Sequence, residues 1–72
     1  MNEEALNTQT RRFLKKVGIQ SQQAIEKAVR DALKNGQLQG DETLEATVQL
    51  EIPELDLTLQ IRGDIALEDQ DE

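Results

Sequence analysis

Carboxylates are the most numerous side chains in this sequence that could do chemistry, with fifteen Asp and Glu residues against eight Lys and Arg. A carboxylate pair can serve as general acid and base only where a protected cleft raises the pKa of one member. The sequence has no His, Cys or Tyr, and its one serine, Ser21, is explained as a helix cap. We therefore expect no enzymatic activity.

Metal and phosphate sites are similarly limited. Zinc, copper and iron sites need imidazole or thiolate ligands, which the sequence lacks. Five acids gather toward its end: Asp64, Glu68, Asp69, Asp71 and Glu72. They show neither the ligand spacing nor the turn glycine of a calcium loop, and no glycine-rich phosphate motif is present. We expect no metal and no cofactor, and we expect residues 68–72 to be a disordered acidic tail.

Cationic side chains form the one pattern with the character of a binding surface. Seven of the eight lie in the first half of the sequence: Arg11, Arg12, Lys15, Lys16, Lys27, Arg30 and Lys34. Residues 1–40 hold seven bases against four acids, whereas residues 41–72 hold eleven acids against Arg62 alone. On a helical wheel the four cations of RRFLKK share one arc, opposite Phe13 and Leu14. Such a split in charge suggests a charged partner or a charged self-contact.

Several interpretations of this basic surface remain open. It can be a solvated outer face, it can bind an acidic protein or the acidic hairpin of another subunit, or it can bind nucleic acid or an anionic membrane. Glu26–Arg30 and Lys27–Asp31 are i,i+4 pairs that need no partner. Phe13 is the only aromatic residue, so bases would find little to stack on. The favoured function is a small non-enzymatic protein-interaction or regulatory module, with a nucleic-acid-binding module as the alternative.

Apolar spacing predicts two helices, over 3–17 and 22–35. In each segment apolar residues recur every three or four positions, which places them on one stripe. Asn2 is the expected cap of the first helix, Gly18 its expected end, and Asn35-Gly36 the end of the second. The connection between the helices is short, so we expect them to pack as a helical hairpin.

After Gly40 the apolar period changes from 3.6 to 2, which predicts strands over 43–52 and 55–67. Together they form an antiparallel hairpin with one apolar and one polar face. We expect a register that pairs Val48 with Leu59 and Glu45 with Arg62. Gly63 is expected to mark a bend or bulge.

The expected fold is therefore α+β, with order ααββ, as a single domain over residues 1–67. A helical hairpin packs on one face of the β-hairpin. A chain of 72 residues without disulfide or zinc has a thin core, so a homodimer is expected. The second strand can then pair with its symmetry mate in a four-stranded sheet. No apolar stretch is long enough to cross a bilayer and the first ten residues do not resemble a secretory signal, so we expect a cytoplasmic protein with no membrane contact.

Several ordered pieces carry a resemblance to a known family: NEEALN-TQTRRFLKKVGIQSQ, IEKAVRDAL, G-x-L-x-G-D-E-x-L and V-x-L-x-IPELDLTL-x-I-x-G-x-I-x-L. Over residues 2–67 the sequence resembles a family of small uncharacterised bacterial proteins, known as a domain of unknown function. The resemblance implies two helices followed by a β-hairpin in a bacterial cytoplasm. It brings no activity, cofactor or functional residue.

Overall fold

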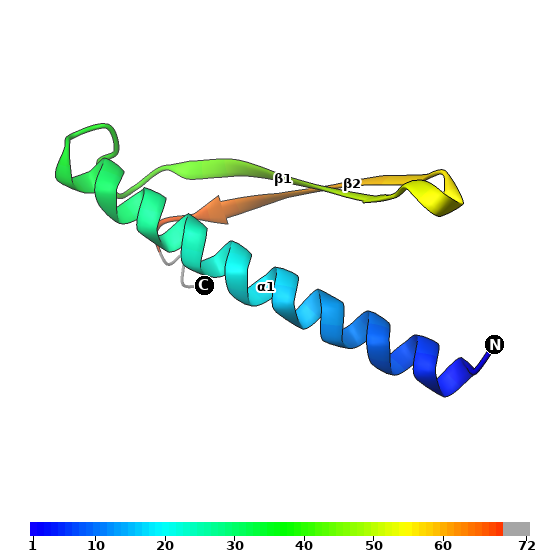
Figure 1. The fold of residues 1–72 in the computed structure, drawn as a ribbon. Helices are drawn as coiled ribbons and strands as arrows, with labels where there is room; N and C mark the ends of the chain where they lie inside the picture. Colours follow the sequence, from blue (N-terminus) through cyan, green and yellow to red (C-terminus); the bar gives the residue numbers. More distant parts are fainter. Residues whose placement is uncertain (69–72) are drawn as a thin grey trace. The chain divides into compact units, whose positions relative to one another are not determined.

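A computed structural model describes residues 1–68 of the chain. Its elements follow in the order α1 (Glu3–Lys34), β1 (Thr43–Ile52), the short 3₁₀ helix η1 (Pro53–Leu55) and β2 (Leu57–Ala66) (Figure 1). Contacts divide the chain into two units, one over Met1–Gln37 and one beginning at Leu38. The single domain over 1–67 stays a prediction, and each unit is described by itself.

The first unit is one helix of 32 residues, so the prediction of two helices packed as a hairpin is wrong. Gly18 lies inside the helix. It does not have the positive φ of a helix-ending glycine, which Gly36 and Gly40 have. A glycine inside a helix costs only about 1 kcal/mol relative to alanine, whereas a break would leave two new sets of helix ends unsatisfied. Ser21, expected as a cap, lies within the helix.

Both ends of α1 are capped by side chains and turns that the sequence indicates. The Asn2 side chain accepts a hydrogen bond from the Ala5 amide at 3.1 Å. Beyond Lys34, Gly36 takes φ +86°. The Gly36 amide then donates to the Leu33 carbonyl and the Gln37 amide to the Ala32 carbonyl. These two hydrogen bonds together form the Schellman motif, which ends helices at a left-handed glycine.

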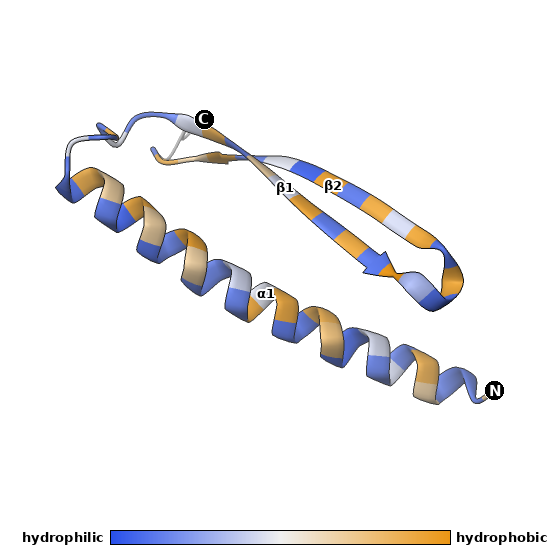
Figure 2. Ribbon diagram, turned by 45° about the horizontal axis from the view of Figure 1, so that its top comes forward, coloured by the Kyte–Doolittle hydropathy of each residue, from blue (hydrophilic) through white to orange (hydrophobic). Residues whose placement is uncertain are grey.

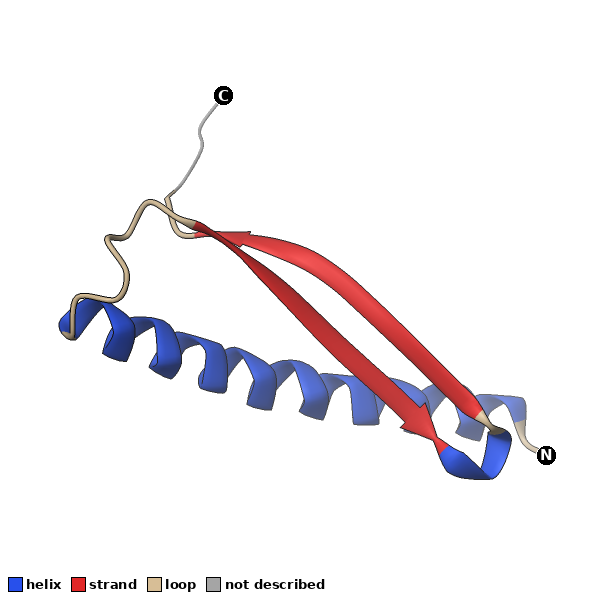
Figure 3. Cartoon of the chain, turned by 90° about the horizontal axis from the view of Figure 1, so that it is seen from above, coloured by secondary structure: helices blue, strands red, loops and turns tan. Residues whose placement is uncertain are grey.

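The second unit contains a two-stranded antiparallel sheet, drawn in red in Figure 3. Apolar and polar residues alternate along both strands (Figure 2). Five cross-strand pairs make up its apolar face: Leu44–Ile65, Ala46–Gly63, Val48–Ile61, Leu50–Leu59 and Ile52–Leu57. We call these ten residues the hairpin apolar face. Gly63 pairs in the unbroken register opposite Ala46, so the expected bend or bulge is not formed there.

The register differs from the expected one by two residues, because the turn is longer than the sequence suggested. Val48 pairs with Ile61 and not Leu59, and Glu45 pairs with Asp64 and not Arg62. Pro53 begins a 3₁₀ turn, and its carbonyl accepts a hydrogen bond from the Asp56 amide at 3.1 Å. Asp56 then takes a left-handed φ of 52° and directs the chain into β2. A shift by two preserves which residues share a face.

No residue of the described range 1–68 is buried. Leu59 and Ile61 of the hairpin are 48% and 51% exposed, and Leu6 and Phe13 of the helix are 53% and 54% exposed. An isolated helix draws most of its stability from packing, and an isolated hairpin is marginal in water. The fold is thus α+β, and large apolar side chains are exposed on both of its units. The four-stranded sheet of a dimer stays a prediction.

Candidate interaction surface

The seven cations named in the sequence analysis all lie on α1, and we call them the basic face: Arg11, Arg12, Lys15, Lys16, Lys27, Arg30 and Lys34. At 100° per residue they occupy an arc of about 160° on one continuous helix. From Arg11 to Lys34 the arc extends about 35 Å along the helix axis. A single helix therefore aligns in one row the residues that two packed helices were expected to bring together.

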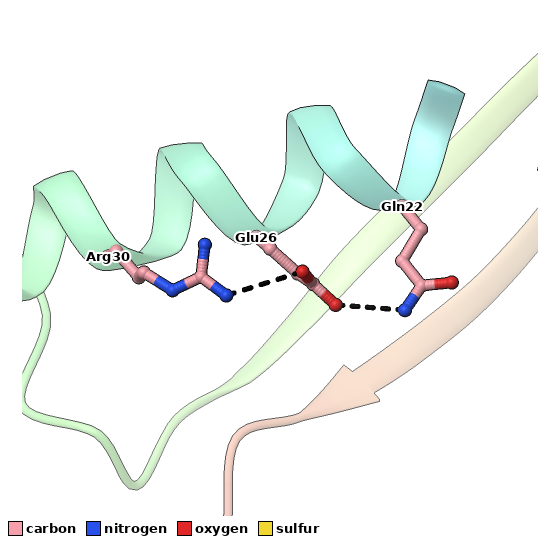
Figure 4. A network of polar contacts seen from close by, with 3 residues as sticks. All are labelled: Gln22, Glu26 and Arg30. Carbon is pink, nitrogen blue, oxygen red and sulfur yellow. Dashed lines mark hydrogen bonds and ion pairs between the residues drawn. The ribbon is translucent and has the colours of Figure 1, made fainter. Parts of the chain in front are cut away.

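Two of these cations form the ion pairs that the sequence predicts. Lys27 Nζ lies 3.0 Å from Asp31 Oδ2, and Arg30 Nη2 lies 3.3 Å from Glu26 Oε1. The Glu26 carboxylate also accepts a hydrogen bond from Gln22 Nε2 at 2.9 Å (Figure 4). The Gln22 hydrogen bond, together with the Arg30 hydrogen bond and charge, lowers the pKa of Glu26 below its ordinary value of 4.5. Exposed pairs of this kind contribute little to the stability of a helix.

The four cations of RRFLKK differ from Lys27 and Arg30 in having no ion pair within the described residues. Among residues 1–68 the structure gives no ion pair to Arg11, Arg12, Lys15 or Lys16. These four carry positive charge without a paired carboxylate in the first half of α1. Phe13 lies on the opposite side of the helix, so this surface has no aromatic side chain for base stacking.

The polar side of the hairpin carries the opposite charge. A shallow hollow there is lined by Glu45, Ala46, Thr47, Arg62, Gly63 and Asp64. Both carboxylates of the hollow are exposed in the structure. Because water solvates them, the hollow does not supply the protected cleft that carboxylate acid–base chemistry needs.

Glu42 is a carboxylate whose role the sequence analysis did not find. It accepts hydrogen bonds from the amides of Gln39 at 2.9 Å and Gly40 at 3.0 Å. These backbone bonds lower the pKa of Glu42 below its ordinary value of 4.5. The signal in the sequence is an acid placed two residues after a glycine. Gly40 takes φ +106° in a turn, and the Glu42 side chain can bind the backbone amides of that turn. The role is structural: Glu42 holds the segment that leads into β1.

The described residues contain neither a metal-binding cluster nor a membrane-spanning helix. Within 1–68, no three Asp or Glu side chains come close enough to hold a metal ion. Of the acidic cluster considered above, Asp69, Asp71 and Glu72 lie outside the described residues, as does the predicted tail beyond Glu68. In the part of the chain that the structure describes, no helix has the length and apolar character needed to span a bilayer.

Comparisons with known proteins place the chain by family. No curated protein and no solved structure matches it. A family described only as of unknown function matches residues 1–68, which is nearly the whole chain. The family match agrees with the expected domain of unknown function, while the structure replaces the expected two helices with one. The chain therefore belongs to DUF6494, a family of unknown function.

Proposed function

We propose that this protein is a small, non-enzymatic, cytoplasmic protein-interaction module that acts as a homodimer. The observation that carries the proposal is the absence of any buried residue in 1–68, together with large exposed side chains on the hairpin apolar face and on α1. Exposed apolar surface of this extent is typical of interaction sites. Covering it in a complex supplies the stabilisation that a helix and a hairpin lack alone.

The non-enzymatic part of the proposal rests on residue chemistry. Without His, Cys or Tyr, the usual nucleophile and base combinations cannot be assembled. The carboxylates of the hairpin hollow are exposed, so the hollow is not the protected cleft that general acid–base chemistry needs. An activity would need a carboxylate buried by the partner itself.

The experiment that tests the proposal is capture of a partner with the tagged full-length chain. Leu59 belongs to the hairpin apolar face, while its neighbour Gln60 points to the polar face and serves as the matched position. We expect the wild type and Gln60→Asp to retain the same protein, and Leu59→Asp to lose it. The captured protein, once purified, must rebind the wild type and not Leu59→Asp. Equal binding by both variants would contradict the proposal.

The four-stranded sheet of a dimer is one form that the homodimer could take. It requires β2 to pair along its free edge with β2 of a second copy, and no strand other than β1 pairs with β2 in the described residues. Free strand edges are natural sites for such pairing. The polar face of this sheet would carry Glu51 and Asp64, which favours a basic partner on that side.

A nucleic-acid-binding module is the second candidate function, and the seven cations of the basic face favour it. A row of cations about 35 Å long could neutralise several phosphates, and such binding weakens steeply as salt rises. We would then expect binding of duplex DNA or RNA in about 50 mM salt that falls when Arg11, Arg12, Lys15 and Lys16 become Gln. No binding at that salt concentration would remove this candidate.

A further inference from the structure

We propose that two copies of the chain pair through α1 as antiparallel helices, with the two-fold axis level with Ile19. The inference rests on the proposed homodimer and specifies its surface. The surface is a stripe that we call the α1 seam. It consists of Leu6, Thr10, Phe13, Leu14, Val17, Ser21, Ala24, Ile25, Ala28 and Ala32.

The seam continues through the whole helix because its spacing repeats every eleven residues. Leu6, Val17 and Ala28 form one such series. Three further series are Thr10–Ser21–Ala32, Phe13–Ala24 and Leu14–Ile25. An eleven-residue repeat keeps an apolar stripe nearly straight on a helix and is found in helices that pack along each other. This continuity depends on α1 being unbroken at Gly18.

The order of side chains along the seam makes it complementary to itself in the antiparallel sense. With the axis at Ile19, Leu6 faces Ala32 of the second copy and Thr10 faces its Ala28. The same register sets Leu14 against Ala24 and Val17 against Ser21, so large residues meet small ones. Phe13 faces Ile25 and is the one pair of two large residues. Facing positions that alternate large and small fill an interface without voids.

A parallel pair would be packed much less evenly. Each residue would then face its own copy, so Phe13 would meet Phe13 and Leu14 would meet Leu14 at one end. At the other end Ala28 and Ala32 would face only alanines. The first half would be overfilled and the second half would leave gaps, and both defects destabilise an interface.

Charge also favours a second copy in the antiparallel direction. The basic face lies on the side of α1 away from the seam, so pairing brings none of its seven cations into the contact. Glu3 and Glu4 in the first turn come level with Lys34 in the last turn of the other copy. The two helix dipoles then run in opposite directions, which places unlike partial charges together at both ends.

Surface exposure shows that the seam is available for such a contact. Leu6, Phe13 and Leu14 are 53%, 54% and 47% exposed, and Ile25 is 37% exposed. These four are the large residues that would anchor the helix pair. The remaining surface of the dimer would present two basic faces to other molecules.

Disulfide cross-linking of the full-length chain tests the arrangement, since the native sequence has no cysteine. The variant carrying both Leu6→Cys and Ala32→Cys should form a covalent dimer on mild oxidation. These positions are about 39 Å apart along one helix, so the bond cannot form within a chain. Lys16→Cys with Gln22→Cys is the matched control: the two positions are level in the same register but lie off the seam, and we expect no cross-link.

The single variants distinguish the direction of pairing. Leu6→Cys alone and Ala32→Cys alone should stay uncross-linked, because the antiparallel register holds each cysteine far from its copy. Cross-linking of either single variant would overturn the proposal in favour of a parallel pair. A wild-type dimer whose Leu6→Cys/Ala32→Cys variant does not cross-link would overturn this arrangement and leave the proposed homodimer standing. A monomeric wild type would remove both.

A second pair of variants covers the case in which the cysteine variants fold poorly. Phe13→Glu places a charge in the seam, and Arg12→Glu places the same charge on the basic face. We expect Phe13→Glu to halve the mass measured by light scattering and to lower the helical circular dichroism with it, and Arg12→Glu to leave both unchanged. A Phe13→Glu chain that retains the dimer mass would overturn the proposal.

Discussion

Glu45 lies directly opposite Asp64 across the β1–β2 ladder, so two carboxylates face each other in the hairpin. Like charges at directly opposed positions destabilise an antiparallel pair. Arg62, on the same face two residues before Asp64, is placed opposite Thr47 instead. The hairpin thus keeps its polar face acidic at a cost in its own stability.

Asp64→Lys should therefore stabilise the hairpin by about 0.2–1 kcal/mol, because it turns a repulsive pair into an attractive one. The free energy of unfolding by urea at low salt measures the effect. The gain should shrink as salt is raised, and it should be smaller when Glu45→Gln is also present. An equal gain in the Glu45→Gln background would show that Glu45 is not the partner.

Gly18→Ala tests the continuity of α1. A Cβ at Gly18 would have no atom within 4 Å, and the residue does not have positive φ. We expect the free energy of unfolding to rise by about 0.5–1 kcal/mol.

Gly36→Ala is the matched control for that substitution. It also has open space for a Cβ, but its φ is +86°. Alanine in that conformation costs about 1–2 kcal/mol, so this variant should unfold more easily than the wild type. If Gly18→Ala destabilised the protein as much as Gly36→Ala, the helix would be broken at Gly18.

Glu42→Gln should make the stability of the protein depend less on pH. Hydrogen bonds from the amides of Gln39 and Gly40 lower the pKa of Glu42 in the folded chain. Its contribution is then fully present above the unfolded value near 4.5 and is lost as pH falls through the lower folded value. The difference in Tm between wild type and Glu42→Gln should be largest near neutral pH and shrink toward pH 3. An unchanged difference over this range would contradict the role assigned to Glu42.

Much of the local structure is predicted by sequence patterns whose physical cause is known. The cap at Asn2, the end at Asn35-Gly36 and the alternation along both strands each depend on neighbouring residues alone. The ion pairs Glu26–Arg30 and Lys27–Asp31 follow from helical spacing in the same way. The composition also indicated a core too thin for a chain of this size.

Two predictions were wrong: the break between two helices and the register of the hairpin. Each depended on which of two competing local structures is more stable. Gly18 and Ser21 favour a break between helices, but a break is rewarded only if the two halves can bury their stripes against each other. The register depended on the turn, where alternation fixes which residues share a face and leaves the length of the turn open. Pro53 and the left-handed Asp56 make a turn two residues longer at its end than the one expected.

The sequence indicates which residues make up the candidate surface, but it did not predict how they are arranged in space. Two short helices side by side would make a broad patch, whereas one helix spreads the seven cations over about 35 Å along its axis. The same continuity joins the first apolar stripe to Ile25, Ala28 and Ala32 of the second in the α1 seam. Whether the seven residues of the basic face bind a partner stays a prediction.

The mass of the full-length protein in solution tests the central claim most directly. Size exclusion coupled to light scattering, at micromolar concentration and moderate salt, should give about twice the chain mass of 8.1 kDa, because large apolar side chains are exposed on both units. Dilution should lower the mass and the helical circular dichroism together, since folding and pairing are coupled. A well-folded monomer of 8.1 kDa over the whole concentration range would contradict the account.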